Sequence, residues 1–314
     1  VLISSQLPIG STTRVAGAFA DSHPDKKVSF AYSPENLRLG HSINVFMKPE
    51  RVVIGVNDSN AKEKLEQLLS QYCDSLIWMN VESAEMTKHA INSFLALSIT
   101  YTNELARLCE MTGARMSEVE KGLRSEPRIG AKAYVHPGSS FGGGTLARDL
   151  QFLSKLAKSV KENTPILSHV LNSNSIHSGW PIQRLKFRLQ SLAHKKIGVL
   201  GLAYKANTSS IRRSNSTRLI QSLLEEKAQV KAFDPQVASL PDEYSNVIIA
   251  KSAQDVFENA DGVIIATEWP EFTHLDFFEL KKSMQNPLII DQNGFIEEAC
   301  REAGMCYLRV GDPA

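Results

Sequence analysis

Short apolar runs alternate with amphipathic stretches between residues 1 and 80. The apolar runs at 28–32 and 51–56 predict strands, and the stretch 61–71 predicts a helix. Strands that alternate with helices along a chain build parallel or mixed α/β sheets. We therefore expect the first 80 residues to belong to one α/β domain.

The stretch from Ala84 to Met111 contains neither proline nor glycine, and its apolar residues recur at helical spacing. This pattern predicts one helix of about 28 residues, about 42 Å long at 1.5 Å per residue, with Gly113 at its C-terminal end. A helix of that length typically spans two domains or forms the seam of a dimer. Further helices are predicted over 116–123, 149–160 and 165–192, the last broken at 179–181, with a loop over 127–144.

From Lys195 onward the pattern returns to strands separated by helices. The pattern predicts strands at 197–202, 229–233, 247–250, 262–267 and 288–291, and a helix over 214–226. Repeated βα units predict a second, doubly wound sheet in this part. The expected fold class is thus α/β, with two Rossmann-like doubly wound sheets joined by a long central helix and a helical middle domain.

Composition narrows the kinds of partner. The 314 residues carry 35 Lys and Arg against 34 Asp and Glu, so the formal net charge is +1. A nearly neutral chain argues against nucleic acid or an anionic membrane surface, both of which are held by strong fields. No apolar run approaches the roughly 20 residues that cross a bilayer, so we expect a cytoplasmic protein.

The four cysteines are Cys73, Cys109, Cys300 and Cys306. They form no CxxC pair and no cluster with histidine at zinc-ligand spacing. We expect neither a disulfide nor a metal site.

The first candidate binding feature is the glycine turn at the end of the strand predicted at 197–202. Gly198-Val199-Leu200-Gly201 lacks the third glycine of the dinucleotide fingerprint, and no GxGxxG occurs in the 314 residues. Taken alone, this turn fits an ordinary tight turn as well as a phosphate cradle. Lys205, with Asn207 and Thr208 close behind, adds a cation and two small hydrogen-bonding side chains, which suits a nucleoside diphosphate.

Other patterns each have a structural alternative. Lys88 and Asn92 are four residues apart and share one helical face, where solvated pairs are also common. Glu35 follows a predicted strand, where ligand-contacting loops gather, although a lone glutamate there is usually solvated. A glycine run before Thr145 and Asp149 fits either a ligand loop or a helix capped by one of these two residues.

The order of these motifs is more specific than any one of them. Along the chain they are Ser33-Pro34-Glu35-Asn36-Leu37-Arg38, Pro49-Glu50-Arg51-Val52-Val53-Ile54-Gly55, Glu85-xx-Lys88-xxx-Asn92, Arg128-Ile129-Gly130, Phe141-Gly142-Gly143, Arg148-Asp149, Gly201-Leu202-Ala203-Tyr204-Lys205 and Thr267-Glu268-Trp269. The series resembles the UDP-glucose/GDP-mannose dehydrogenase family from the Pro8-Ile9-Gly10 turn onward. The resemblance implies oxidation of the C6 alcohol of a nucleotide sugar, UDP-glucose being the nearest type, with two NAD⁺ to give a uronic acid.

The resemblance also implies a domain plan. Residues 1–80 would be the C-terminal part of an NAD-binding Rossmann domain, 81–192 a helical middle domain, and 193–314 a nucleotide-sugar-binding Rossmann-like domain. The helix near 84–111 would form a homodimer. Residue 1 is Val and enters directly into a strand-like run, so the glycine fingerprint would precede it and the chain alone would be inactive.

Catalytic roles follow from residues that match the family pattern. Lys88 resembles the lysine that polarises the C6 oxygen, with Asn92 beside it, and an ammonium near a developing alkoxide stabilises the loss of hydride. Asp149 resembles the acid that orders the catalytic water. Thr145 occupies the position of the family's nucleophilic cysteine.

Binding roles follow in the same way. Glu35 resembles the glutamate of the substrate loop, and Phe141, Gly142 and Gly143 resemble the glycine-rich substrate turn. Arg128 resembles an arginine that reaches the neighbouring subunit's sugar site, and Lys205 a lysine that contacts substrate. The residues expected to border the NAD site are Gln6, Glu35 and Arg212.

Departures from the family pattern leave the substrate and the number of oxidation steps open. A threonine hydroxyl is far less acidic than a thiol, so Thr145 puts the covalent route through a thiohemiacetal in doubt. Leu39 replaces a second glutamate, Gln6 a threonine, Asn293 an arginine expected near Asp291, and Ser209 and Ser210 a pair of aspartates. Three hypotheses remain: oxidation to the acid through a hydrated aldehyde, a single two-electron oxidation, and a non-catalytic nucleotide-sugar binder.

Overall fold

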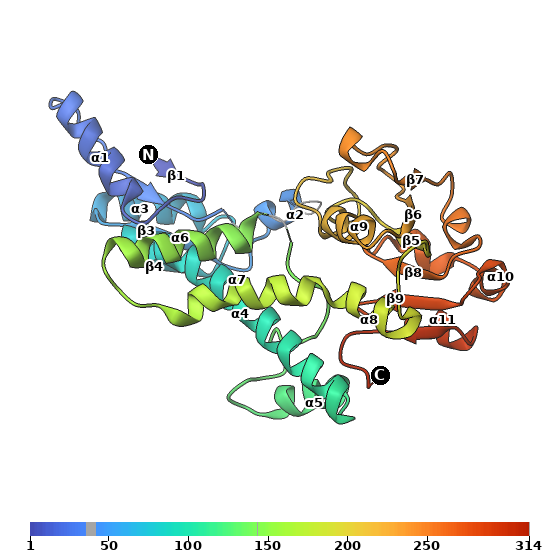
Figure 1. The fold of residues 1–314 in the computed structure, drawn as a ribbon. Coiled ribbons are helices and arrows are strands. Elements are labelled where there is room, and N and C mark those ends of the chain that lie inside the picture. The colour runs from blue at the N-terminus through green and yellow to red at the C-terminus, as the bar shows by residue number, and fades with distance from the viewer. Residues whose placement is uncertain (36–41, 143, 314) are drawn as a thin grey trace. The chain divides into compact units, whose positions relative to one another are not determined.

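The computed structural model describes residues 1–35, 42–142 and 144–313 (Figure 1). The chain divides into two compact units, Val1–Phe94 and Leu95–Ala314. The division falls inside helix α4 (Val81–Thr112), so this helix contributes to both units.

Unit 1 contains a four-stranded sheet in the order β1 (Leu2–Ile3), β2 (Ala31–Tyr32), β3 (Val52–Val56) and β4 (Leu76–Met79). β1 pairs with β2 and β3 with β4 in parallel, whereas β2 and β3 are antiparallel. The helices of this unit are α1 (Ser11–Ser22), α2 (Ser42–Met47), α3 (Ser59–Leu69) and the start of α4. The result is the mixed α/β sheet that the sequence pattern allowed.

Several boundaries in unit 1 differ from the prediction. The strand expected over 28–32 is reduced to Ala31–Tyr32, because its parallel partner β1 is itself only two residues long. The helix expected over 61–71 is α3, which begins at Ser59 because the carboxylate of Asp58 accepts a hydrogen bond from the backbone N–H of Asn60. β4 and α1 were not predicted.

The helical part of unit 2 begins with the second half of α4. This helix has 32 residues, somewhat more than predicted, and it ends before Gly113, which has a φ of +78°. α5 (Met116–Ser125), α6 (Thr145–Ser159), α7 (Pro165–Ser178) and α8 (Trp180–Leu189) follow, and α6 packs beside α7 (Figure 1). The break predicted at 179–181 is confirmed: α7 ends before Gly179, and Pro181 lies in the first turn of α8.

The start of α6 was predicted wrongly. The helix begins at Thr145, four residues before the predicted start, and its N-cap is Gly144, with no side chain bonded at the cap. Neither Thr145 nor Asp149 therefore caps it. Asp149 lies in the second turn with 1% of its surface exposed.

The C-terminal part of unit 2 is a parallel sheet in the strand order β10, β9, β8, β5, β6, β7. The strands are β5 (Lys196–Leu200), β6 (Gln229–Phe233), β7 (Ile248–Ile249), β8 (Gly262–Ile265), β9 (Leu288–Asp291) and β10 (Cys306–Leu308), with helices α9 (Asn215–Glu225), α10 (Phe277–Ser283) and α11 (Glu297–Glu302). β6 and β9 have the predicted bounds, whereas β5, β7, β8 and α9 are shorter than predicted. β5 ends before Gly201 because this residue, at a φ of +94°, leaves the strand conformation.

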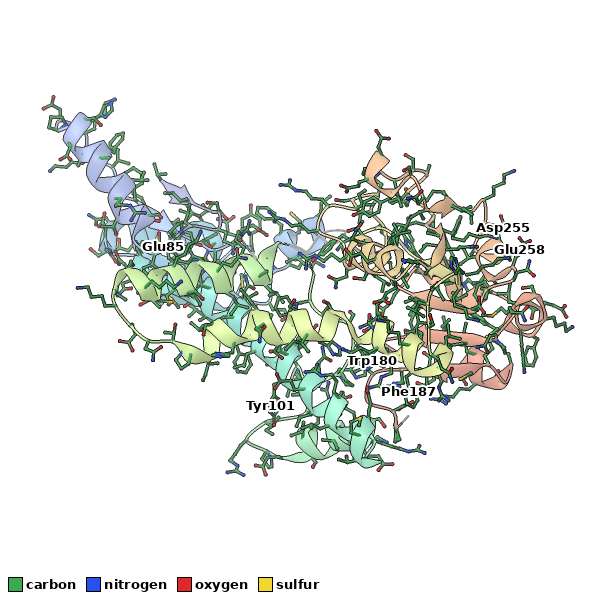
Figure 2. All side chains as sticks on the ribbon, viewed as in Figure 1. Glu85, Tyr101, Trp180, Phe187, Asp255 and Glu258 are labelled. Carbon is green, nitrogen blue, oxygen red and sulfur yellow. The ribbon has the colours of Figure 1, made fainter. Side chains whose placement is uncertain are left out.

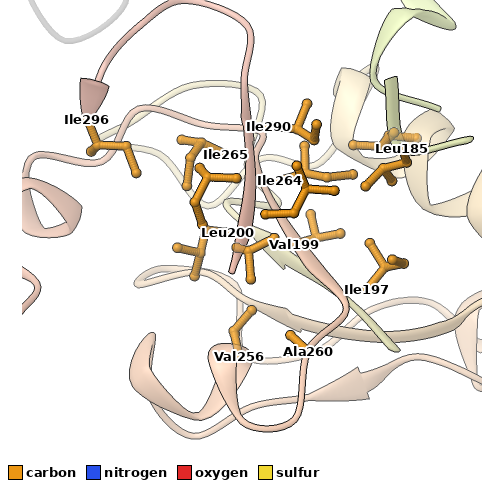
Figure 3. Close-up of a cluster of buried hydrophobic side chains, with 14 of the residues drawn as sticks. Leu185, Ile197, Val199, Leu200, Val256, Ala260, Ile264, Ile265, Ile290 and Ile296 are labelled. Carbon is orange, nitrogen blue, oxygen red and sulfur yellow. The ribbon is translucent and has the colours of Figure 1, made fainter. Parts of the chain in front are cut away.

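The core of unit 2 lies on the central strands of this sheet. Val199, Leu200, Ile264 and Ile290 are fully buried and pack with Leu185 of α8 (Figure 3). Strands buried on both faces need continuous apolar runs, which is why the sequence marked these strands clearly.

A buried carboxylate joins the helical part of unit 2 to its C-terminal end. Glu110 of α4 accepts hydrogen bonds from Trp180 Nε1 at 2.9 Å and from the backbone N–H of Gly311 at 2.8 Å, and it pairs with Arg184 at 2.7 Å. Burial raises the pKa of Glu110, while these three partners oppose that rise.

In the part of the chain that the structure describes, no helix combines the length and the apolar character needed to span a membrane. Within the same residues, no group of three or more His, Cys, Asp or Glu side chains could hold a metal ion.

Candidate functional site

Unit 2 contains a cleft of about 710 Å³ at the carboxyl ends of three of its strands. The lining includes Tyr204 and Lys205 after β5, Glu268 after β8, and Gln292 and Asn293 after β9. The sheet changes its direction of winding between β5 and β8, because β6 and β7 extend it on one side and β8 to β10 on the other. Ligands of open α/β sheets bind in the crevice at such a switch point.

The opposite wall of the cleft comes from the loop between α5 and α6 and from the start of α6. Residues 134 and 136–142 of this loop line the cleft, together with Thr145 and Leu146. Phe141 is buried, and both its N–H and its C=O are bonded to the side-chain amide of Asn174, at 2.9 and 3.0 Å. The loop therefore has a defined conformation on the side away from the cleft.

A neutral histidine supports the same loop. Arg107 Nη1 donates a hydrogen bond to His177 Nδ1 at 2.9 Å, so the ring proton is on Nε2, which donates to the carbonyl of Gly138 at 2.7 Å. Burial and then the positive charge of Arg107 lower the pKa of His177 to about 4, and the bond to Gly138 opposes this fall.

The charged residues of the cleft suit an anionic ligand. Lys205 and Arg218 are cations on the lining, and Glu268 is the one acidic residue among the described lining residues. Helix α9 presents its N-terminal end to the cleft: Ser214, its N-cap, accepts from the N–H of Ser216 at 3.1 Å, and both residues line the wall. A helix N-terminus carries a partial positive charge.

The structure brings four of the predicted site residues together on this cleft: Phe141, Gly142, Thr145 and Lys205. Gly143 lies outside the described residues, as does Leu39. Arg212 is exposed in the segment between Lys205 and α9. The side chain of Arg128 is 88% exposed and pairs with Glu126 at 2.7 Å, away from any buried site.

Asp149 lies in α6 of unit 2, where it is buried and is not among the described lining residues of the cleft. The other predicted residues belong to unit 1. Lys88 and Asn92 lie one turn apart on α4, as their spacing predicted. Gln6 follows β1 and Glu35 follows β2, at the carboxyl ends of two parallel strands.

Glu85 has a structural role that the sequence analysis missed. Its fully buried carboxylate accepts hydrogen bonds from the N–H of Gly10, the N–H of Thr12 and the hydroxyl of Thr12 (Figure 2). It thereby caps α1 from a position 73 residues further along the chain. The glycine turn at Gly10 follows β1, but its backbone N–H is bonded to Glu85 and is not available to a phosphate.

Gln6 and Glu35 thus lie beyond the carboxyl ends of β1 and β2, and the carboxyl ends of parallel strands are where ligands of open α/β sheets bind.

No cysteine is among the described residues that line the cleft. Cys73, Cys109 and Cys300 are buried and Cys306 is partly buried, and all four are free thiols. Burial, followed by the nearby Asp291 carboxylate, raises the pKa of Cys300 to about 12, so this thiol is not activated. Thr145, in contrast, is exposed and is the first residue of α6.

Comparison with known proteins identifies the family of the chain. Three domain models of the UDP-glucose/GDP-mannose dehydrogenase family match it: the NAD binding domain over residues 1–73, the central domain over 82–176 and the UDP binding domain over 198–298. The UDP-glucose 6-dehydrogenase of Rickettsia typhi is 33% identical over 99% of this chain and 73% of its own length. The UDP-glucose 6-dehydrogenase TuaD of Bacillus subtilis is 32% identical over 100% of this chain and 69% of its own length.

A solved structure agrees in fold. The UDP-glucose dehydrogenase of Pyrobaculum islandicum superimposes with a TM-score of 0.83 at 31% identity, over 95% of this chain and 68% of that one. The chain belongs to the UDP-glucose/GDP-mannose dehydrogenase family, whose members are NAD-dependent.

Proposed function

We propose that this protein oxidises the C6 hydroxyl of a nucleotide sugar of the UDP-glucose type toward a uronic acid, with NAD⁺ as hydride acceptor. The observation that carries the proposal is the cleft at the switch point of the C-terminal sheet. Four residues chosen from the family pattern line it; the wall that carries Lys205 matches the UDP binding domain, and the loop wall that carries Phe141, Gly142 and Thr145 matches the central domain.

The nucleotide part of the substrate would lie in this cleft. Lys205 and Arg218 supply positive charge for a diphosphate, and the N-terminus of α9 adds a partial positive charge from the same side. The glycine at position 142 lets a ligand approach the backbone of the loop.

The catalytic groups would be Lys88, Asn92 and Asp149. Hydride leaves C6 as the hydroxyl loses its proton, so negative charge develops on the oxygen, and the ammonium of Lys88 would stabilise it. Asn92, one turn further along α4, would hold the same oxygen by a hydrogen bond from its amide. Asp149 would order the water that attacks the aldehyde and take its proton. NAD⁺ supplies the hydride acceptor, and Gln6, Glu35 and Arg212 would border it.

Thr145 favours a second candidate, a single two-electron oxidation. It stands at the position of the nucleophilic cysteine, and none of the four cysteines is found among the described lining residues. Without a thiol, the second oxidation must pass through a hydrated aldehyde, or the reaction stops at the carbonyl. The third candidate, a non-catalytic binder, does not account for Lys88 and Asp149 being kept.

We also propose a homodimer built on α4. Phe94, Tyr101 and Leu108 follow each other at intervals of seven on this helix, and they are 64%, 50% and 61% exposed. Figure 2 labels Tyr101, the middle residue of the three. A heptad repeat of exposed apolar residues is typical of a helix that packs along a second helix. The exposed Arg128 would then reach the partner's sugar site.

The division into domains at 1–80, 81–192 and 193–314, and a cytoplasmic location without nucleic-acid or membrane partners, complete the proposal.

The test is the yield of NADH per nucleotide sugar consumed by the full-length protein, with UDP-glucose, UDP-N-acetylhexosamines and GDP-mannose assayed in parallel and the product identified by mass. Two NADH and a uronic acid support the main proposal, whereas one NADH and a carbonyl product support the single oxidation. Binding of a nucleotide sugar without any NADH would contradict both and favour the binder.

A further inference from the structure

The cleft loop 138–141 is held in place by side chains. Six of its backbone N–H and C=O groups are hydrogen-bonded to five side chains from elsewhere in unit 2, those of Asn103, Asn174, His177, Asn215 and Asn293. Three of these come from α4 and α7, which belong to the same helical part of the chain as the loop itself.

The other two side chains, those of Asn293 and Asn215, come from the C-terminal α/β part of unit 2 and line the cleft. Asn293, just after β9, accepts a hydrogen bond through Oδ1 from the N–H of Ser139 at 2.7 Å. Asn215, the first residue of α9, donates through Nδ2 to the carbonyl of Ser140 at 2.6 Å. The two bonds fix two neighbouring residues of the loop, Ser139 and Ser140, to the segment after β9 and to the start of α9.

The glycines of the loop are required by these two contacts. A Cβ atom at position 138 would lie 2.3 Å from Asn293 Oδ1, and one at position 142 would lie 2.8 Å from Asn215 Oδ1. Each glycine therefore lets an amide side chain lie directly against the backbone. Gly138 therefore matches Asn293, and Gly142 matches Asn215. A larger residue at either glycine would push the loop away from the asparagine.

We propose that Asn293 and Asn215 are positioning residues for nucleotide binding: they hold the loop wall of the cleft at a fixed distance from the wall that carries Lys205 and Arg218. This inference rests on the proposed function of the cleft. Asn293 stands where the family pattern leads one to expect an arginine. In its place is a neutral amide whose oxygen is bonded to the loop backbone, so its effect on binding is exerted through the loop and not through charge.

This difference gives a measurable signature. A residue that acts through the loop changes the affinity for charged and uncharged ligands by the same factor. A residue that contacts the diphosphate changes the affinity for UDP alone. Loss of one neutral hydrogen bond is expected to weaken binding about 3- to 10-fold.

The experiment measures the dissociation constants of uridine and UDP for the wild-type chain and for Asn293→Ala, Asn293→Asp and Lys205→Met. We expect Asn293→Ala to weaken both ligands by the same factor, and Lys205→Met to weaken UDP far more than uridine. Asn293→Asp keeps an acceptor oxygen for Ser139, so it should bind uridine like the wild type. Hydrogen exchange at the Ser139 amide is measured in parallel and should speed up in Asn293→Ala but not in Asn293→Asp.

Three results would count against the inference in different ways. Unchanged affinities in Asn293→Ala would overturn the positioning role and leave the nucleotide site intact. A loss confined to UDP would make Asn293 a direct contact to the phosphates. A wild-type chain that binds neither uridine nor UDP would overturn the proposed function of the cleft itself.

Discussion

His177 should make the stability of unit 2 fall as the pH is lowered below 6.5. The ring is 1% exposed, and it is held neutral between Arg107 and the carbonyl of Gly138. A protonated ring would direct a second N–H at the Arg107 guanidinium in a buried setting. Acid therefore forces the folded protein either to keep a neutral histidine or to break this arrangement.

The magnitude follows from the difference in pKa between the two states. The pKa of His177 is about 4 in the folded protein and 6.5 in an unfolded chain. Since the folded pKa is depressed, the unfolded state takes up the proton first, and the stabilisation present above pH 6.5 is lost as the pH falls toward 4. The expected loss is about 2 kcal/mol at pH 5 and about 3 kcal/mol in the acid limit.

The assay is urea unfolding of the wild type and of His177→Gln, followed by circular dichroism between pH 7.5 and pH 5. Glutamine keeps an N–H donor for Gly138 but does not titrate. The difference in unfolding free energy between the two proteins should shrink by about 2 kcal/mol over this range, and other titrating groups cancel in that difference. A difference that stays constant with pH would refute the argument, because it would mean that His177 has an ordinary pKa in the fold.

Three further predictions concern the cleft, a turn and the dimer. Thr145→Cys should add one thiol that iodoacetamide alkylates quickly, because Thr145 is exposed on the cleft whereas Cys73, Cys109 and Cys300 are buried. UDP-glucose should slow this alkylation. Rapid labelling that UDP-glucose leaves unchanged would place position 145 outside the ligand site. Gly201→Ala should lower the free energy of unfolding by more than Gly113→Ala, which should cost about 1 kcal/mol. Both glycines have a positive φ, but a Cβ at 201 would lie 2.6 Å from the Thr267 nitrogen, whereas one at 113 meets nothing within 4 Å. Equal losses in thermal or urea unfolding would contradict this prediction. Leu108→Glu should convert a dimer to monomers in light scattering, whereas Phe278→Glu, at a site of similar exposure on α10, should not; a wild type that is already monomeric would dispose of the α4 dimer.

The elements that the sequence predicted best are those with a local physical cause. β9 is an apolar run that ends in Asp291, and β6 alternates polar residues with the buried Val230 and Ala232; the bounds of both strands agree with the prediction. The break before α8 is marked by Gly179 and Pro181. β1 and β2 are two residues each, so their extent depends on pairing between distant segments and leaves no periodic pattern to detect.

The site divides in the same way. Phe141, Gly142, Thr145 and Lys205 could be predicted because the order of motifs identified a family. Asn174, Asn215 and His177 were missed because each bonds to backbone groups that lie 33 to 75 residues away in sequence. Every residue has a backbone N–H or C=O group, so a side chain that bonds to the backbone does not require a particular residue type at its partner position. The glycines at 138 and 142 were the sequence features that could have indicated these contacts, since each makes room for an amide side chain, that of Asn293 or Asn215.

The most direct test of the central claim, that the cleft of unit 2 binds the nucleotide sugar, is hydrogen–deuterium exchange of the chain with and without UDP-glucose. The account predicts slower exchange at three places that line the cleft: the loop 138–142, the segment after β5 that holds Lys205, and the start of α9. Slower exchange confined to residues outside these segments, or no change at saturating UDP-glucose, would contradict it.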